Sequence, residues 1–364
     1  MRRALPDPAH VRRVLIFRPG SLGDTVVALP ALRRVAATWP HAKRVVLTNR
    51  PRHGRETDIA AILDGTGLAE GYMHFDAGAN RMGLLSLRKA IREFSPDVLV
   101  HLGERQAPLR IFRQLAFFRL TTGAAFVGLP VGAHAEHHQD KATAHWESEA
   151  AYLVRRLDRL APFSIDTPGA FDLTLSPREI ATANAALGEI GRHREVIAIA
   201  PGAKMDAKDW EEPRWLKLIA RLAAQRPDAA LIAIGAPAES ERVQRLAAAW
   251  RGPVIDLCGR LTPRESAAAL ARAKLLIAHD GGPMHLASAV GTPVVAIFSA
   301  RAQPGIWFPH GAAHRVLYRH LACAGCGLET CLAQAKACIT SITVDEVLAA
   351  TLELLGRPRL TGAA

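Results

Sequence analysis

The sequence predicts an α/β protein with two doubly wound, Rossmann-like domains that face each other across a cleft. Short β-branched or aliphatic runs alternate with Ala-, Leu- and Arg-rich helical stretches along the 364 residues. Such alternation is typical of βαβ units and a mostly parallel sheet. The chain is too long for one ordinary domain, and a Pro- and Gly-containing segment at 161–176 interrupts the alternation near its middle.

The first domain is assigned to residues 1–165. Strands are expected over 14–17, 45–48, 71–75, 98–102 and 125–129, and helices over 24–38, 84–94, 109–120 and 147–160. The last helix carries Ala151, Val154 and Leu157 at helical spacing. The segment after it holds Pro162 and Pro168 with little periodicity, so it is interpreted as the interdomain linker.

The second domain is assigned to residues 176–342, where the same pattern resumes. Strands are expected over 196–200, 230–234, 254–257, 275–278 and 294–298, and helices over 214–224, 238–250, 263–271 and 284–290. A last helix over 344–355 lies within the remaining segment, 343–364. We expect this helix to pack back on the first domain.

The bulk composition limits the class of protein. Hydrophobic residues make up 49% of the chain, but no apolar run reaches the roughly 18–20 residues of a membrane span. The basic N-terminus is not followed by an apolar stretch, so a secretory signal is not expected and the cytosol is the predicted location. The net charge of +12 suits nucleic acid, an anionic membrane or a polyanionic substrate, although an Arg-favouring genome explains it equally well. Without a nucleic-acid-binding signature, no nucleic-acid partner is expected.

Ligands of doubly wound sheets bind where strands lead into helices, so these junctions are the candidate sites. The first is Arg-Pro-Gly-Ser-Leu-Gly-Asp at 18–24. Gly20 and Gly23 permit a tight turn and close approach of a ligand. Asp24 is either functional or only a first-turn capping acid. The segment is neither a dinucleotide fingerprint nor a P-loop.

Two further junctions lie in the second half. In the loop at 200–210, Lys204 and Lys208 either meet phosphate as point charges or are simply solvated. In the motif His-Asp-Gly-Gly-Pro-Met-His at 279–285, the glycines expose backbone N–H groups at a helix N-terminus. Because the helix dipole is positive there, this is an anion site, and His285 either points toward it or is an ordinary core or capping histidine.

In order and separation, the three junctions resemble the heptosyltransferases of glycosyltransferase family 9, which have the GT-B fold and add heptose to the lipopolysaccharide inner core. The matching signatures are Leu-Gly-Asp at 22–24 followed by Pro30, a Gly-Ala loop ending in Lys-x-Trp at 202–210, and Asp-x-Gly-x-x-His at 280–285. The turn Gly-Thr-Pro at 291–293 also fits. The resemblance covers nearly the whole chain.

The resemblance implies roles for individual residues. Asp24 would be the general base for the acceptor hydroxyl, and Arg18 and Ser21 beside it are expected to contact the acceptor. The donor-binding set would be Lys208 on the diphosphate; Asp280, Gly281, Gly282 and His285 at the diphosphate and sugar; and Glu239 on the ribose. Glu239 is the loosest match, since a surface-helix Glu explains it nearly as well. Ala203, Lys204 and Gly281 depart from residues common in the family, which leaves the donor sugar open.

The chemistry agrees with these roles. Displacement at an anomeric carbon needs a carboxylate beside the incoming hydroxyl and passes through an oxocarbenium-like transition state. A Lys and a helix N-terminus can stabilise the charge on the departing diphosphate. The chain has no Asp-x-Asp motif, so no catalytic metal or other cofactor is expected.

Four cysteines cluster near the C-terminus: Cys323, Cys326, Cys331 and Cys338. Four thiolates can bind zinc or iron, although only the first pair has zinc-knuckle spacing. Reduced thiols and disulfides are the alternatives to a structural metal. A related group of heptosyltransferases that modifies autotransporter proteins carries an iron-binding cysteine motif, so a protein acceptor stays open.

The sequence therefore predicts an inverting, metal-independent heptosyltransferase that uses ADP-heptose. Its acceptor would be an anionic, lipid-linked lipopolysaccharide core precursor, met in transient contact with the cytosolic face of the inner membrane. Candidate contacts from the basic surface are Arg12, Arg13, Arg18, Arg50, Arg52 and Arg55. The alternatives are another donor sugar, a protein acceptor, or a catalytically silent sugar-nucleotide-binding module.

Overall fold

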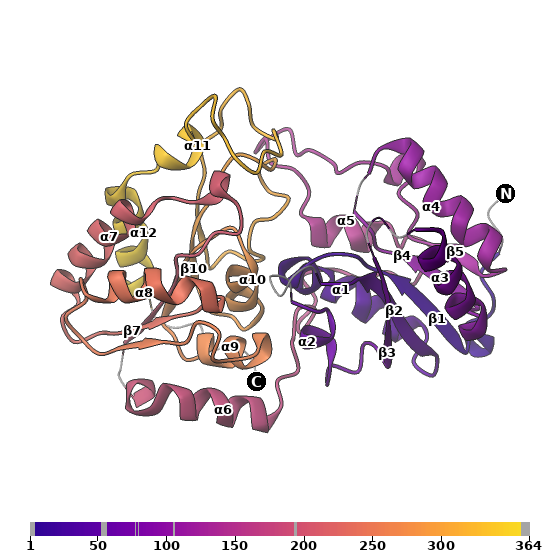
Figure 1. Ribbon diagram of the computed structural model, residues 1–364, viewed down its shortest axis with the longest axis horizontal. Coiled ribbons are helices and arrows are strands. Elements are labelled where there is room, and N and C mark those ends of the chain that lie inside the picture. The colour runs from indigo at the N-terminus through magenta and orange to yellow at the C-terminus, as the bar shows by residue number, and fades with distance from the viewer. Residues whose placement is uncertain are drawn as a thin grey trace. The chain divides into compact units, whose positions relative to one another are not determined.

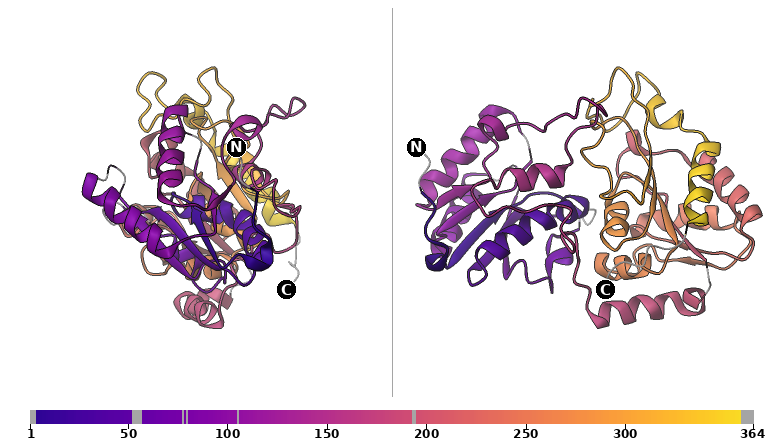
Figure 2. Two further views of the ribbon diagram at one scale, coloured as in Figure 1. Left: turned by 90° about the vertical axis from the view of Figure 1, so that its right-hand side faces the viewer. Right: turned by 180° about the vertical axis from the view of Figure 1, so that it is seen from behind.

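The structure, a computed structural model, describes residues 4–51, 57–76, 78, 80–104, 106–192 and 195–357 (Figures 1 and 2). Its contacts divide the chain into two compact units. The first comprises Met1–Gln139 and Glu147–Asp172, and the second Asp140–Trp146 and Leu173–Ala364. The main boundary falls within the segment interpreted above as a linker. The excursion of Asp140–Trp146 into the second unit, where Trp146 N donates to Pro304 O at 2.7 Å, was not predicted.

The described part of the first unit contains a five-stranded parallel sheet in the order β3-β2-β1-β4-β5. Its strands are β1 (Arg13–Phe17), β2 (Lys43–Asn49), β3 (Gly71–Phe75), β4 (Val98–His101) and β5 (Ala125–Val127). Its helices are α1 (Leu22–Thr38), α2 (Ala60–Leu63), α3 (Arg81–Phe94), α4 (Pro108–Thr121) and α5 (Glu149–Arg155). The parallel sheet with crossover helices is the predicted doubly wound fold.

Alternation along the strands decides which helices cover each face of this sheet. Leu15 and Phe17 of β1 pack in one cluster with Ile91 of α3 and Phe118 of α4. Successive side chains of a strand point to opposite faces. Right-handed crossovers place α1 and α5, which contact each other, on the second face. Helices α3 and α4 therefore share one face and bury only their sheet-facing sides.

The described part of the second unit contains a six-stranded parallel sheet in the order β11-β10-β9-β6-β7-β8. Its strands are β6 (Val196–Ala200), β7 (Ala230–Ala233), β8 (Val254–Asp256), β9 (Leu275–His279), β10 (Val294–Ile297) and β11 (Arg315–Leu317). Its helices are α6 (Pro177–Leu187), α7 (Glu212–Gln225), α8 (Ser240–Ala247), α9 (Pro263–Leu270), α10 (Gly282–Ala289), α11 (Ala337–Thr340) and α12 (Val344–Gly356).

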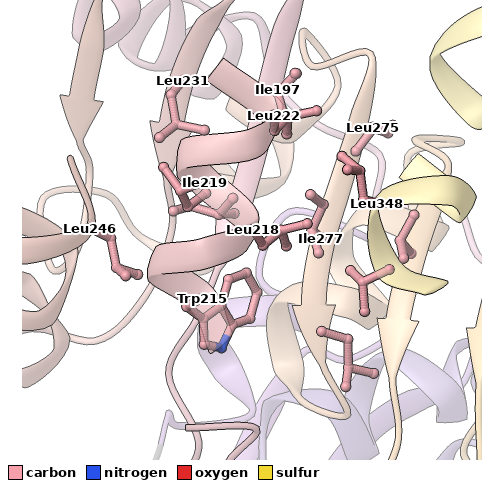
Figure 3. Close-up of a cluster of buried hydrophobic side chains, with 14 of the residues drawn as sticks. Ile197, Trp215, Leu218, Ile219, Leu222, Leu231, Leu246, Leu275, Ile277 and Leu348 are labelled. Atoms are coloured by element: carbon pink, nitrogen blue, oxygen red, sulfur yellow. The ribbon is translucent and has the colours of Figure 1, made fainter. Parts of the chain in front are cut away.

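The core of the second unit corrects the prediction for the last helix (Figure 3). Helix α7 presents Trp215, Leu218 and Leu222 to the strands, where they meet Ile277 of β9 and neighbouring apolar side chains. Leu348 of α12 joins the same cluster, and α12 contacts α7, β9, β10 and β11. The prediction that this helix packs on the first domain is therefore wrong: its apolar side completes the core of the second unit.

Helix α6, the short helix α11 and strand β11 of the second unit were not predicted. Helix α6 begins where the linker was placed, with a capping box in which the Glu179 carboxylate accepts from Ser176 N at 2.7 Å and from its Oγ at 2.8 Å. Strand β11 is a three-residue edge strand. None of the helices in the described part of the chain is long and apolar enough to cross a membrane.

In each sheet there is one point at which the direction in which successive strands are added changes, although the strands are all parallel. In the first sheet the chain runs β1, β2, β3 one way and β4, β5 the other, so the reversal lies between β1 and β4. In the second sheet it lies between β6 and β9. Ligands of open α/β sheets bind at the carboxyl ends of the strands at such points. The loops after these four strands are therefore where each unit's site is expected.

Candidate active site

The loop after β1 holds Asp24 in the first turn of α1. Its carboxylate Oδ2 accepts hydrogen bonds from Ser21 N at 2.6 Å and from Ser21 Oγ at 2.7 Å. Asp24 thus serves the capping box of α1, the plainer of its two interpretations. The carboxylate is only half-buried. The cap fixes its position without removing it from solvent, so capping and a catalytic role are compatible.

Gly20 is required by the position of Asp24. Its φ is +150°, and a Cβ at this residue would lie 2.5 Å from the Asp24 Cβ. Gly20 N also donates to Asn49 Oδ1 at 2.7 Å, which ties the loop to the end of β2. The predicted tight turn therefore requires glycine at position 20, because any side chain there would displace Asp24.

The structure corrects the assignment of Arg18 as an acceptor-binding residue. Its side chain is fully buried, and its guanidinium donates to Leu102 O at 2.8 Å and to Asp24 O at 2.6 Å. Its Nη1 also lies 3.5 Å from Glu149 Oε1. A buried cation needs such partners because desolvation is costly. Arg18 therefore supports the loop that carries Asp24 and has no surface for an acceptor.

The other residues predicted to contact the acceptor are Ser21 and several arginines. Ser21 uses its hydroxyl on Asp24. Arg50 pairs with Asp76 at 3.0 Å on the surface. Arg52 and Arg55 lie outside the described residues.

A second carboxylate, Glu104, was missed by the sequence analysis. It follows β4, the strand next to β1 in the sheet. Its side chain shares a hydrogen bond with that of Asp24. Although the residue is exposed, desolvation of the carboxyl and the charge of Asp24 together raise the pKa of Glu104 to about 7. Two adjacent carboxylates cannot both ionise freely, so the pair holds a proton up to near neutral pH.

In the second unit, the loops after β6 and β9 bring Lys208 and Asp280 together. Lys208 Nζ lies 2.6 Å from Asp280 Oδ2 and donates to Asp280 O at 3.3 Å. Asp280 is buried, while Lys208 keeps 17% of its side-chain surface exposed. The two predicted donor-site residues are thus adjacent. Asp280 holds the ammonium in place at the edge of the sheet.

Helix α10 begins directly after Asp280, with Gly281 as its N-cap and Gly282 as its first residue. No side chain in the described part of the chain caps this N-terminus, so its backbone N–H groups keep the character of an anion site. His285 lies in the first turn, but its side chain is buried, with its ring 6.4 Å from that of Trp307. The structure therefore places the glycines at the surface of the site and His285 beneath it.

Glu239 lies beside the same site, after β7. Its carboxylate Oε2 accepts from Ala236 N at 3.1 Å, and burial raises its pKa. A Cβ at Gly202 would lie 2.0 Å from the carboxyl carbon, and one at Gly235 2.1 Å from Oε2. The two glycines that follow β6 and β7 therefore leave the space that the Glu239 carboxylate occupies.

His279, the last residue of β9, holds the β6 loop and was not predicted to do so. Its Nδ1 donates to Gly202 O at 3.0 Å, and its Nε2 accepts from Trp210 N at 3.1 Å. Burial lowers the pKa of His279 to about 4, so the ring is neutral and can act as donor and acceptor at once. The buried ring therefore holds the loop that carries Lys208 at two points, Gly202 and Trp210.

The predicted metal centre involves the four clustered cysteines near the C-terminus. All five cysteines of the chain are free, and within the described residues no three His, Cys, Asp or Glu side chains lie where they could hold a metal ion. The four clustered cysteines do lie near one another. Burial raises the pKa of Cys338, and the nearby thiols of Cys323, Cys331 and Cys326 raise it further. A structural zinc or iron ion at this cluster stays a prediction.

The fold and the family match together define the class. The two Rossmann-like units have the GT-B fold, and the match to a glycosyltransferase family shows that the protein is a glycosyltransferase. The chain belongs to glycosyltransferase family 9 (heptosyltransferase), whose sequence profile matches residues 135–337.

Individual relatives agree with this family. The chain is 31% identical to lipopolysaccharide heptosyltransferase 1 of Pseudomonas aeruginosa over 159 residues, which is 41% of this chain and less than half, 44%, of that protein. It is 25% identical to lipopolysaccharide heptosyltransferase 3 of Escherichia coli over 76% of this chain and 81% of that one. The solved structure of E. coli ADP-heptose lps heptosyltransferase II has a TM-score of 0.64 at 19% identity, covering 94% and 98% of the two chains.

Proposed function

We propose that the protein transfers a heptose from ADP-heptose to a lipopolysaccharide inner-core acceptor, with inversion and without a catalytic metal. The observation that carries the proposal is the Lys208–Asp280 pair at the open N-terminus of α10, next to Glu239. This arrangement suits a nucleoside diphosphate, because it offers positive charge for phosphate and a carboxylate for ribose hydroxyls. The names of the two curated relatives support a lipopolysaccharide acceptor, and that of the solved structure an ADP-heptose donor.

In the proposed reaction, Asp24 takes the proton of the acceptor hydroxyl as its oxygen bonds to the anomeric carbon of the donor. The bond from that carbon to the diphosphate breaks, and ADP leaves with the electron pair. Lys208 Nζ has three N–H donors, donates to Asp280 O and forms an ion pair with the Asp280 carboxylate. In the proposed reaction its remaining donor capacity and the N–H groups of α10 stabilise the charge on the leaving diphosphate.

The acceptor in this proposal is anionic and lipid-linked. The enzyme therefore works in transient contact with a membrane, which we place at the cytosolic face of the inner membrane. The alternatives, another sugar donor or a protein acceptor, share the same nucleotide chemistry. The first alternative differs in the sugar that the second unit binds, and the second alternative in the acceptor that the first unit receives.

Nucleotide titration tests the proposal. Calorimetry should show that the protein prefers ADP to UDP and GDP, and that Lys208→Ala weakens ADP binding by about 10- to 100-fold, the value of a charge-assisted hydrogen bond. The matched control is Lys204→Ala, which removes an exposed lysine from the same loop and should leave the affinity unchanged. Preference for another nucleotide would remove the heptose assignment, and no binding of any of the three nucleotides would overturn the proposed donor site.

The carboxylate pair predicts how transfer depends on pH. Below about pH 7 Glu104 keeps its proton and donates to Asp24, which weakens Asp24 as a base. Above that pH Glu104 ionises, and its charge raises the proton affinity of Asp24. We therefore expect kcat to rise through pH 7. In Glu104→Gln, which is neutral at every pH, this rise should disappear from a kcat-against-pH profile, whereas an unchanged profile would exclude the coupling.

A further inference from the structure

Large apolar side chains are exposed mainly on two helices of the first unit. Of the nine such side chains in the described part of the chain, six lie on α3 and α4: Met82, Leu84, Leu85, Leu109, Phe112 and Leu120. Phe112 is 69% exposed and Leu120 74%. A concentration of this kind marks an interaction surface, whereas single exposed apolar residues are normal.

On α4 these residues form a continuous stripe. Leu109, Phe112, Ala116 and Leu120 are three or four positions apart and lie on one side of the helix. Ile111 and Phe118, on the opposite side, are buried. Helix α4 therefore has two apolar sides, one used by the core of the first unit and one facing solvent.

Helix α3 extends the surface. Its exposed apolar residues come from its first turns, while Ile91 is buried against the sheet. Arg88 Nη2 donates to Leu120 O and Arg92 Nε to Thr121 O, each at 3.4 Å, so the two helices are tied side by side. At about 1.5 Å per residue, two 14-residue helices present a surface about 21 Å long.

The charge on this surface is predominantly positive. Helices α3 and α4 together carry seven Arg or Lys residues and a single acid, Glu93. On α4, Arg113 and Arg119 flank the apolar stripe on its two sides. Phe112 and Ala116 also line a hollow of about 480 Å³, with Arg119 in its wall, so apolar surface continues beyond the stripe.

We propose that the exposed face of α3 and α4 docks on an anionic phospholipid bilayer. An apolar stripe flanked by Arg and Lys is the arrangement by which interfacial helices insert side chains below the headgroups while the cations meet lipid phosphates. A protein partner would need matching acids, whereas an anionic membrane offers negative charge everywhere. This inference rests on the proposed function in one respect: a lipid-linked acceptor would be met at the same membrane.

Flotation with lipid vesicles tests the proposal. We expect binding to vesicles of equal parts phosphatidylcholine and phosphatidylglycerol, and little binding to phosphatidylcholine alone. The triple variant Arg110→Gln, Arg113→Gln, Arg119→Gln should lower partition by on the order of 100-fold, about fivefold per Arg. The variant Phe112→Ser, Leu120→Ser should lose binding as well, because the Arg and Lys residues of α3 and α4 alone attract the protein only weakly to the vesicles.

The control replaces exposed apolar residues elsewhere, Ile180→Ser with Leu332→Ser, and should bind as the wild type does. Equal binding by all variants, or no preference for the anionic vesicles, would overturn the proposal. A dimer in sedimentation velocity that Phe112→Ser, Leu120→Ser abolishes would assign the surface to a second copy instead. The α3–α4 variants should keep their affinity for ADP, so failure here is distinguishable from failure of the donor assignment.

Discussion

Replacing Asp24 by Asn should lower the kcat of sugar transfer by about 10²- to 10⁴-fold, the usual contribution of a general base. Donor binding should persist, because Lys208, Glu239 and α10 belong to the other unit. The side-chain amide in Asp24→Asn would keep an oxygen that accepts from Ser21 N, so the start of α1 is preserved. Steady-state ADP release with acceptor, together with calorimetry of donor binding, measures both quantities.

The comparison of Asp24→Asn with Asp24→Ala separates catalysis from capping. Alanine removes the cap as well as the base, and should lower the free energy of unfolding by about 1 kcal/mol relative to asparagine. Both variants should be equally slow in transfer if the carboxylate is the base. If Asp24→Asn keeps a near-normal kcat, Asp24 is only the capping acid of α1, and the base must be sought elsewhere.

The alternation of strands and helices was sufficient to predict every described strand except the edge strand β11, because buried parallel strands are short apolar runs separated by longer amphipathic helices. Helix α6 was missed although Ser176 and Glu179 stand at capping-box spacing. Pro177, which directly follows the segment interpreted as the linker, is the first residue of α6, and proline is favoured at that position. The docking of α12 could not be predicted, because an apolar stripe does not specify which sheet it covers.

The sites were predictable only where a motif marked them. The Gly-Gly start of α10 and the lysine loop were identified, yet nothing local indicated that Lys208 and Asp280 lie 2.6 Å apart. Glu104 follows β4, which lies next to β1 where the strand order changes direction. That position would have marked Glu104 as a candidate, but the order of strands in a sheet is not visible in the sequence. Arg18 was misassigned because a basic residue beside a candidate acid resembles a ligand contact until its burial is known.

Replacing Gly202 by Ala should weaken ADP binding by about 10- to 100-fold without unfolding the protein. The new Cβ would lie 2.0 Å from the Glu239 carboxyl carbon. The carboxyl is the end of a flexible side chain, so it can swing away at little cost to stability. The binding loss is then that of a carboxylate hydrogen bond to ribose, and Glu239→Ala should show the same loss in calorimetry.

The double variant decides between two explanations of such a loss. If Gly202 acts only by leaving room for Glu239, the two changes share one cause, and Gly202→Ala should have no effect in the Glu239→Ala background. If the losses add, the Cβ itself blocks the nucleotide, and Gly202 lies against the ligand. If Glu239→Ala alone binds ADP normally, Glu239 has no part in ribose recognition. The carboxylate then serves only its bond to Ala236 N, and the donor site reduces to Lys208, Asp280 and the start of α10.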